Sequence, residues 1–219
     1  MNRMNLQFTR PNQPPPVVPL DIVLASQSVG RKLLLEKLGL RFRVVVSRID
    51  EETIIHADPL TTLKKRAAAK AEEVATHPRI YTLAEEGKTL VVAADSMAVV
   101  GKKMYGKSID REDTRRMLKI LMGRTHHFVT AVTIFQMEGT NVVKRWEKAV
   151  TTKVTMRRLS AVELDSYIAR FDFSRFAAGY ALNEAPWDLV TKVDGSYTNV
   201  IGLPFEVLLP ILRKLEVIL

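Results

Sequence analysis

Apolar positions along the chain fall into two patterns, short continuous runs and stripes spaced three or four residues apart. Short apolar runs bounded by polar residues predict strands, and the spaced stripes predict amphipathic helices. The predicted strands cover 22–26, 41–47, 89–107 with a turn inside, 126–135, 142–156 and 187–193. The predicted helices cover 28–38, 59–76, 110–123, 160–170 and 202–215. This alternation, with one hairpin in the middle, predicts an α/β protein with a mixed central sheet flanked by helices.

Polar residues at the predicted helix starts support these boundaries. Asp58 precedes the helix over 59–76, and Asp110 with Asp113 starts the next one. Ser160 and Glu163 have the spacing of a capping box, in which each residue satisfies a free N–H group of the helix start. Caps of this kind fix where a helix begins.

Length and composition narrow the class of protein. The chain has 219 residues and no cysteine, which suits one large domain or two small lobes and excludes disulfides and thiolate metal sites. Residues 1–20 are polar and proline-rich and are predicted to be a disordered or loosely packed extension, with a weak transit segment as the alternative. Residues 21–219 are then predicted to form the folded domain. No apolar run is long enough to span a membrane, so a cytoplasmic location is predicted.

The formal net charge of +9 favours an anionic partner. The basic residues are scattered, and neither an RNA-binding aromatic signature nor zinc-finger spacing is present. Charge alone therefore leaves a nucleotide, a nucleic acid and a membrane surface open.

The stretch "LASQSVGR" places a basic residue where a helix dipole disfavours it. Arg31 lies in the first turn of a predicted helix, directly after Ser26 and Ser28. Hydroxyls, backbone N–H groups and a guanidinium at a helix start suit a phosphate. The glycine-rich P-loop pattern is absent from this stretch.

Ionisable residues also interrupt apolar patterns elsewhere. Lys70 lies within the apolar stripe of the helix over 59–76, and Asp95 interrupts an apolar strand. Snorkelling of Lys70 and backbone bonding of Asp95 are the structural alternatives. Lys107 follows the turn after Asp95, and three acids stand at 50–52. Lysines and a carboxylate-bound hard cation beside phosphates indicate phosphoanhydride hydrolysis. His126 and His127 adjoin a strand and are interpreted as structural.

Ordered blocks along residues 21–215 resemble the Maf family of nucleoside triphosphate pyrophosphatases. The opening block "LASQSVGR" has Val29 where the family has proline. "IDEE", "AAAKAEE", "AADS" and "KS" follow in the family's order. "MLKILMGRTHHFVTAV" and "GSYTNVIGLPF" match two further blocks. The whole set of blocks carries the resemblance.

The resemblance implies a fold, an activity and roles for residues. The fold would have a cleft between two lobes and be similar to that of inosine triphosphate pyrophosphatases. The reaction would cleave a nucleoside triphosphate to a monophosphate and pyrophosphate with Mg²⁺ or Mn²⁺. Asp95 would accept the proton of the attacking water and bind the metal with Glu51, although the pattern leaves Asp50 and Glu52 open as metal ligands. The residues expected to contact the triphosphate are Ser26, Ser28, Arg31, Lys70 and Lys107.

Substrate selectivity is expected at Gly30, Ser96 and Asn183, where the family's branches differ. Ser96 and Asn183 resemble the dTTP/UTP branch more than the 7-methyl-GTP branch, and Gly30 is expected to widen the pocket. Two alternatives remain: a pyrophosphatase for a modified nucleotide such as 7-methyl-GTP, and a non-catalytic basic protein that binds nucleic acid or has a regulatory role in septum formation. Homodimers are common in the family, so a homodimer is expected, without nucleic acid or membrane partners.

Overall fold

The structure is a computed structural model that describes residues 20–172, 175–184 and 188–219. The predicted N-terminal extension lies outside the described residues apart from Leu20. Trp187, at the start of the predicted strand over 187–193, lies outside them as well. No helix among the described residues is long and apolar enough to cross a membrane.

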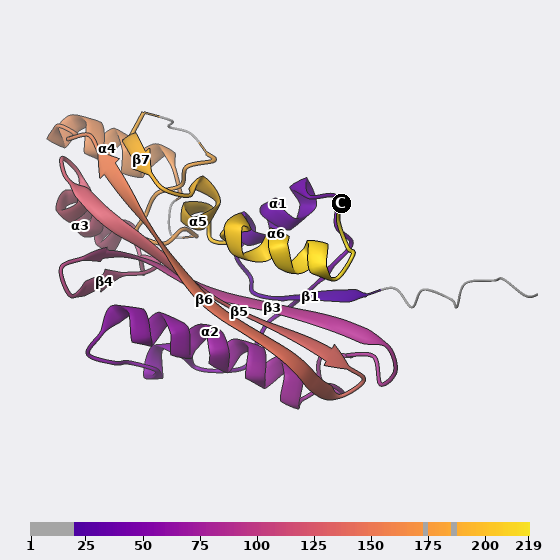
Figure 1. The fold of residues 1–219 in the computed structure, drawn as a ribbon. Helices are drawn as coiled ribbons and strands as arrows, with labels where there is room; N and C mark the ends of the chain where they lie inside the picture. Colours follow the sequence, from indigo (N-terminus) through magenta and orange to yellow (C-terminus); the bar gives the residue numbers. More distant parts are fainter. Residues whose placement is uncertain (1–19, 173–174, 185–187) are drawn as a thin grey trace, which may run out of the picture.

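The described residues form a seven-stranded mixed sheet, as predicted (Figure 1). Its order is β2-β1-β3-β5-β6-β7, with β4 paired to β3. β1 runs parallel to β2 and β3, and the other pairs are antiparallel. The strands are β1 (Asp21–Ala25), β2 (Arg43–Val45), β3 (Lys88–Val100), β4 (Lys103–Tyr105), β5 (Thr125–Glu138), β6 (Asn141–Met156) and β7 (Val190–Asp194).

Three of the helices begin at the predicted caps Asp58, Asp110 and Ser160. The side chains of Ser28, Asp58, Asp110 and Ser160 each accept the N–H group three residues ahead. The helices are α1 (Val29–Lys37), α2 (Pro59–Thr76), α3 (Arg111–Leu121), α4 (Ala161–Arg170), α5 (Tyr197–Ile201) and α6 (Phe205–Lys214), with a 3-10 turn η1 (Glu51–Thr53).

The predicted helix over 202–215 begins too early. Gly202 has a φ of 119° and caps the end of α5, and α6 starts only after Pro204. The left-handed conformation at Gly202 ends one helix, so the same residue cannot start the next.

Helices cover both faces of the sheet, with α2 on one side and α1 and α6 on the other (Figure 1). Val91 and Ala93 of β3 pack with α2, whereas Val92 and Ala94 pack with α1 and α6. Because side chains alternate along a strand, the next residue, Asp95, belongs to the α2 side.

Two lobes share the long strands β3, β5 and β6. α3, α4 and β7 gather at one end of the sheet around their own apolar cluster, β1, α1 and α6 lie toward the other end, and α2 runs along the long strands between them (Figure 1). β3 pairs with β1 as far as Val92 and with β4 from Ala98 onward. Residues 93–97 therefore lie along the edge of β3 between these two neighbours, and the main cavity opens there.

Candidate active site

A cavity of about 750 Å³ lies beyond the carboxyl ends of β1 and β2, between the two lobes. Ligands of parallel α/β sheets commonly bind at such strand ends. The loop after β1, η1, α2 and β3 contribute lining residues, and the other lobe contributes the segments after β4 and around 175–183. The charged lining residues are Arg31, Arg66, Lys70, Lys107, Arg116 and Arg175, with the acids Glu51, Glu52, Asp95 and Asp113.

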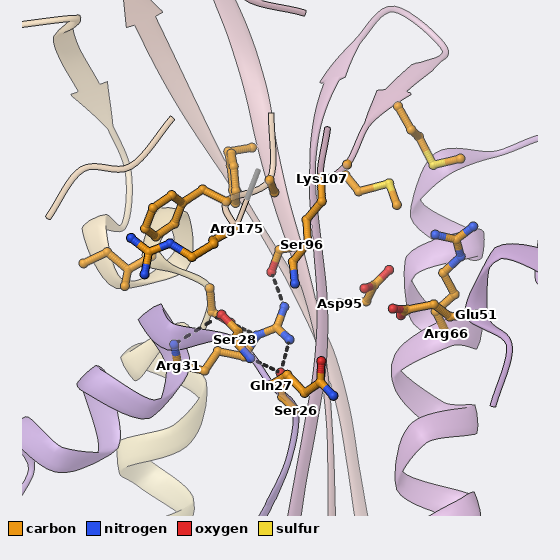
Figure 2. A pocket seen from close by; sticks show the side chains of 18 of the residues that line it. Ser26, Gln27, Ser28, Arg31, Glu51, Arg66, Asp95, Ser96, Lys107 and Arg175 are labelled. Carbon is orange, nitrogen blue, oxygen red and sulfur yellow. Dashed lines mark hydrogen bonds between the residues drawn. The ribbon is translucent and has the colours of Figure 1, made fainter. Parts of the chain in front are cut away.

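One wall of the cavity is built around Arg31 at the start of α1 (Figure 2). Its Nη1 donates to Ser26 Oγ at 2.7 Å, and its Nη2 donates to Ser96 Oγ at 2.9 Å. Nε donates to the carbonyl oxygen of Gly202 at 2.9 Å. All three acceptors are neutral, and the side chain is 6% exposed. Arg31 thus joins three segments: residues 26–28, called the serine loop below, β3 and the end of α5. Its positive charge stays next to the cavity.

The serine loop and Ser96 are held in place by this arrangement. Ser28 donates its backbone N–H to Ser26 Oγ at 3.2 Å, and Ser28 Oγ caps α1. Ser96 Oγ accepts from Arg31 and also from Thr130 Oγ1 at 2.9 Å. The hydroxyls predicted to contact substrate therefore belong to one bonded network.

The opposite wall carries Lys70 between two carboxylates. Lys70 Nζ lies 3.0 Å from Asp95 Oδ1 and also forms an ion pair with Glu51. Lys70 and Asp95 are 8% and 7% exposed. The snorkelling alternative for Lys70 is therefore wrong, and among the described residues the Asp95 side chain accepts its hydrogen bond from Lys70 rather than from the backbone. Asp95 Oδ2 is buried without a hydrogen-bond partner among the described residues.

Burial and charge move the two acids in opposite directions. Burial raises the pKa of Asp95, and the positive charges of Lys70 and Arg31 only partly offset this. For Glu51 burial also favours the neutral form, but Lys70, Arg31 and Arg66 together lower its pKa. A carboxylate with a raised pKa beside one with a lowered pKa is an arrangement that suits a proton acceptor and a permanently charged ligand.

The three neighbouring acids at 50–52 have different surroundings. Asp50 Oδ1 accepts the N–H of Glu52 at 3.2 Å and caps η1. Glu52 forms an ion pair with Arg66 at 3.2 Å, whereas Glu51 faces Lys70. Glu51 is therefore the acid of this group that shares a partner with Asp95.

The donor set of this wall fits a hard divalent cation. Carboxylate oxygens are its preferred protein ligands, and Mg²⁺ commonly takes one or two carboxylates and completes its shell with water and substrate phosphates. Glu51 and Asp95 provide two carboxylates in one cavity, and Asp95 Oδ2 is uncommitted among the described residues. The described part of the chain has no group of three or more side chains suited to a metal ion.

Lys107 and Asn183 line the cavity from the other lobe, and Gly30 does not line it. Lys107 follows β4, bridges to Ala177 through its backbone, and points its ammonium group into the cavity (Figure 2). A Cβ at Gly30 would lie 2.5 Å from the carbonyl oxygen of Ile201. The expectation that Gly30 widens the pocket is therefore wrong, because its missing side chain makes room for α5 against α1.

Comparisons with known proteins match this architecture. The family model "Maf-like protein" matches residues 21–215. The chain belongs to the Maf family. A dTTP/UTP pyrophosphatase of Chelativorans sp. (strain BNC1) is 35% identical over 189 residues, which cover 86% of this chain and 88% of the relative. A dTTP/UTP pyrophosphatase of Geobacter sp. (strain M21) is 36% identical over 183 residues, covering 84% and 89%.

Solved structures give a more distant similarity. A HAM1 protein from Coxiella burnetii aligns with a TM-score of 0.44 and 12% identity, over 91% of this chain and 100% of that chain. A nucleoside-triphosphatase, dITP/XTP pyrophosphatase, from Mycobacterium abscessus aligns with a TM-score of 0.40 and 15% identity, over 89% and 97%.

Three arginines that line the cavity of this Maf-family chain were not predicted from the sequence. Arg66 is 3% exposed and lies four residues before Lys70 on the inward side of α2, so helical periodicity alone carried a signal for it. Arg116 and Arg175 are exposed and come from the second lobe. No local pattern marks them, because the tertiary fold brings them to the cavity.

His126 has the structural role proposed for it. Its Nε2 lies 2.8 Å from the hydroxyl oxygen of Tyr180, and its side chain is buried. Burial, with a smaller contribution from His127, lowers the pKa of His126 to about 4. The imidazole is therefore neutral near pH 7 and packs behind the cavity wall that Tyr180 forms.

Proposed function

We propose that this chain is a nucleoside triphosphate pyrophosphatase that hydrolyses dTTP and UTP to the monophosphate and pyrophosphate with a divalent cation. The observation that carries the proposal is the cluster of buried Asp95 and Lys70 with half-buried Glu51, which faces Arg31 and the serine loop across one cavity. The cavity volume of about 750 Å³ is within the range of small-molecule sites. The Maf-family relatives, which are named dTTP/UTP pyrophosphatases, support the same reaction.

The Arg31 wall would bind the triphosphate tail. Three of the five N–H groups of Arg31 make the bonds to Ser26, Ser96 and Gly202. The start of α1 adds backbone N–H groups and the positive end of its dipole. Lys107 would approach the phosphates from the second lobe. These groups neutralise the charge that pyrophosphate carries as it leaves.

Asp95 would accept the proton of the attacking water. Lys70 holds Asp95 Oδ1, and Oδ2 has no hydrogen-bond partner among the described residues, so the carboxylate keeps acceptor capacity for the proton. The raised pKa of Asp95 brings the base closer to neutral pH, where proton transfer is more effective. The water oxygen would bond to the α-phosphorus while the bond from that phosphorus to the bridging oxygen of pyrophosphate breaks.

Glu51 and Asp95 would hold the divalent cation. When bound, such a cation supplies further stabilisation of negative charge on the phosphate oxygens. Lys70 lies between the two acids, so its ammonium group keeps both carboxylates oriented in the free protein.

The base would be read by Ser96 and Asn183. Asn183 is half-buried at the cavity, and its amide offers both a donor and an acceptor to a pyrimidine edge. The relatives' names favour dTTP and UTP over 7-methyl-GTP. The non-catalytic nucleic-acid-binding alternative is not favoured, since a polymer surface does not need the buried Asp95–Lys70 pair.

A substrate screen tests this function. The purified chain is incubated with dTTP, UTP, the other common triphosphates and 7-methyl-GTP, with Mg²⁺ or Mn²⁺ and with a chelator as control. We expect pyrophosphate from dTTP and UTP and its loss in the chelator. Turnover confined to 7-methyl-GTP would contradict the selectivity, and turnover of none would contradict the enzyme.

Other expected properties rest on the sequence and on the family resemblance. A cytoplasmic location, a homodimer, the lack of a nucleic-acid partner and a role in septum formation stay predictions.

A further inference from the structure

Arg66 holds the short turn that carries Glu51. Its Nε donates to the carbonyl oxygen of Ile54 at 3.0 Å, and its Nη2 donates to Glu52 Oε2 at 3.2 Å. Glu52 directly follows Glu51, and Ile54 comes three residues after it. Arg66 and Lys70 lie one helical turn apart on α2, so one helix face holds the turn at both ends.

The turn has little else to connect it to the protein. The other hydrogen bonds of residues 50–54 among the described residues stay inside the turn, such as Asp50 to Glu52 and Thr53 to Asp50. The hydrogen bonds and ion pairs that join it to the rest of the described structure come from Arg66 and Lys70. The segment after the turn is tied to α2 through the backbone of His56 and the hydroxyl of Thr62. The polar contacts that hold residues 50–54 themselves against α2 are those of Arg66 and Lys70.

Stability alone does not account for Arg66. The side chain is 3% exposed, and its Nη1 is buried without a hydrogen-bond partner among the described residues. Burying a charge is costly unless it is fully paired. Its ion-pair partner Glu52 is 79% exposed, so the pair loses much of its strength to water. What the contacts of Arg66 do achieve is a fixed location for the turn.

We propose that Arg66 is a positioning residue that sets the Glu51 carboxylate in place for the divalent cation. The proposal rests on the proposed function, because it takes Glu51 as a cation ligand. Residues that orient metal ligands commonly contribute about 10- to 100-fold in metal affinity or activity.

The charge of Arg66 and its positioning role predict opposite changes in cation affinity when Arg66 is substituted. Removing a positive charge near two carboxylates tightens binding of a cation if charge alone matters. Removing the contacts to Ile54 and Glu52 releases the turn and weakens binding if position matters. The sign of the change therefore separates the two roles.

The test measures Mn²⁺ binding to the nucleotide-free protein by electron paramagnetic resonance. The variants are Arg66→Met, Arg66→Lys and the matched control Lys65→Met, which removes one charge from the exposed side of the same helix. We expect Arg66→Met to weaken binding about 10-fold or more. Arg66→Lys keeps the charge but lacks the planar fork, so it should weaken binding as well, and Lys65→Met should leave it within about twofold.

Turnover and folding provide the accompanying readouts. With dTTP, both Arg66 variants should lower kcat and leave the nucleotide KM nearly unchanged, since the phosphate wall is untouched. Circular dichroism checks folding, and Arg66→Lys carries the test if Arg66→Met does not fold.

Each outcome bears on a specific claim. Mn²⁺ binding as tight as wild type, or tighter, in the folded Arg66 variants would overturn the positioning role while wild-type turnover upholds the enzyme. A wild-type protein that binds no Mn²⁺ would overturn the positioning role as well. A wild-type protein that binds Mn²⁺ but turns over no triphosphate would overturn the proposed function, and the Mn²⁺ series would still decide the role of Arg66.

Discussion

The two walls of the cavity are each organised by a buried arginine, and the two arginines have different partners. Arg31 donates to two hydroxyls and a carbonyl, whereas Arg66 donates to a carbonyl and the carboxylate of Glu52. Arg31 fixes the serine loop, which follows the parallel strand β1. Arg66 fixes the turn at residues 50–54, which follows the parallel strand β2.

The difference in partners gives the walls different electrostatic roles. Neutral acceptors leave the charge of Arg31 available to an anion at the cavity. A carboxylate partner offsets the charge of Arg66, so its wall is left with Glu51, Asp95 and Lys70. One residue type therefore organises both walls, and under the proposed function one wall would bind the phosphates and the other the cation.

The largest expected effect is at Asp95, the proposed proton acceptor. It lies on the wall formed by Glu51, Lys70 and Asp95, called the acidic wall below. Asp95→Asn keeps the shape but removes the proton acceptor, so kcat for dTTP should fall by about 10³-fold. Pyrophosphate release measures this, and Asp58→Asn, which keeps an exposed helix cap, is the matched control. Near-normal kcat in folded Asp95→Asn would show that another group accepts the proton.

The next largest effect is a loss of folding stability at acid pH, which we expect from His126. This residue belongs to neither wall. The pKa of His126 is about 4 in the folded protein and about 6.5 when unfolded. Below pH 6.5 the unfolded state binds the proton more readily, so stability present at neutral pH is lost as the pH falls from 6.5 to 4. The loss amounts to about 3 kcal/mol, from about 1.4 kcal/mol per pKa unit.

Urea unfolding of wild type and His126→Gln at a series of pH values measures this loss. Glutamine offers Tyr180 a hydrogen-bond partner without titrating, so its stability should change less between pH 6.5 and 4. Equal slopes for both proteins would assign the acid instability to other groups. The comparison also separates unfolding from the protonation of Asp95 in an activity profile.

The smallest expected effect compares the two arginines directly. Arg31→Lys keeps the charge but cannot reach Ser26, Ser96 and Gly202 together, so the nucleotide KM should rise about 10-fold. Mn²⁺ affinity in the nucleotide-free protein should stay within about twofold, the reverse of the result expected for Arg66→Lys. Steady-state kinetics and Mn²⁺ titration of the two variants check this. If nucleotide KM and Mn²⁺ affinity change to a similar degree in Arg31→Lys and in Arg66→Lys, the two walls do not have separate roles.

Local patterns in the sequence predicted much of the fold and two of the central residues. Periodicity and caps identified the strands and the longer helices. Lys70 and Asp95 were recognised because each breaks an apolar pattern, and the structure pairs them at 3.0 Å. A charge in an apolar setting needs a partner, so such positions carry information about tertiary contacts.

Features that depend on long-range packing were not predictable in this way. α5 has five residues, too few for a helical period to show, and it decides both the environment of Gly30 and one bond of Arg31. The different surroundings of Asp50, Glu51 and Glu52 depend on α2, because three adjacent acids look alike until Arg66 and Lys70 select among them.

The central claim is that a water held at the acidic wall attacks the α-phosphorus while the Arg31 wall holds the departing pyrophosphate. Hydrolysis of dTTP in ¹⁸O-labelled water, followed by mass spectrometry of both products, tests it directly. We predict one labelled oxygen in dTMP and none in pyrophosphate. Label in pyrophosphate, or labelled inorganic phosphate released in place of pyrophosphate, would contradict it.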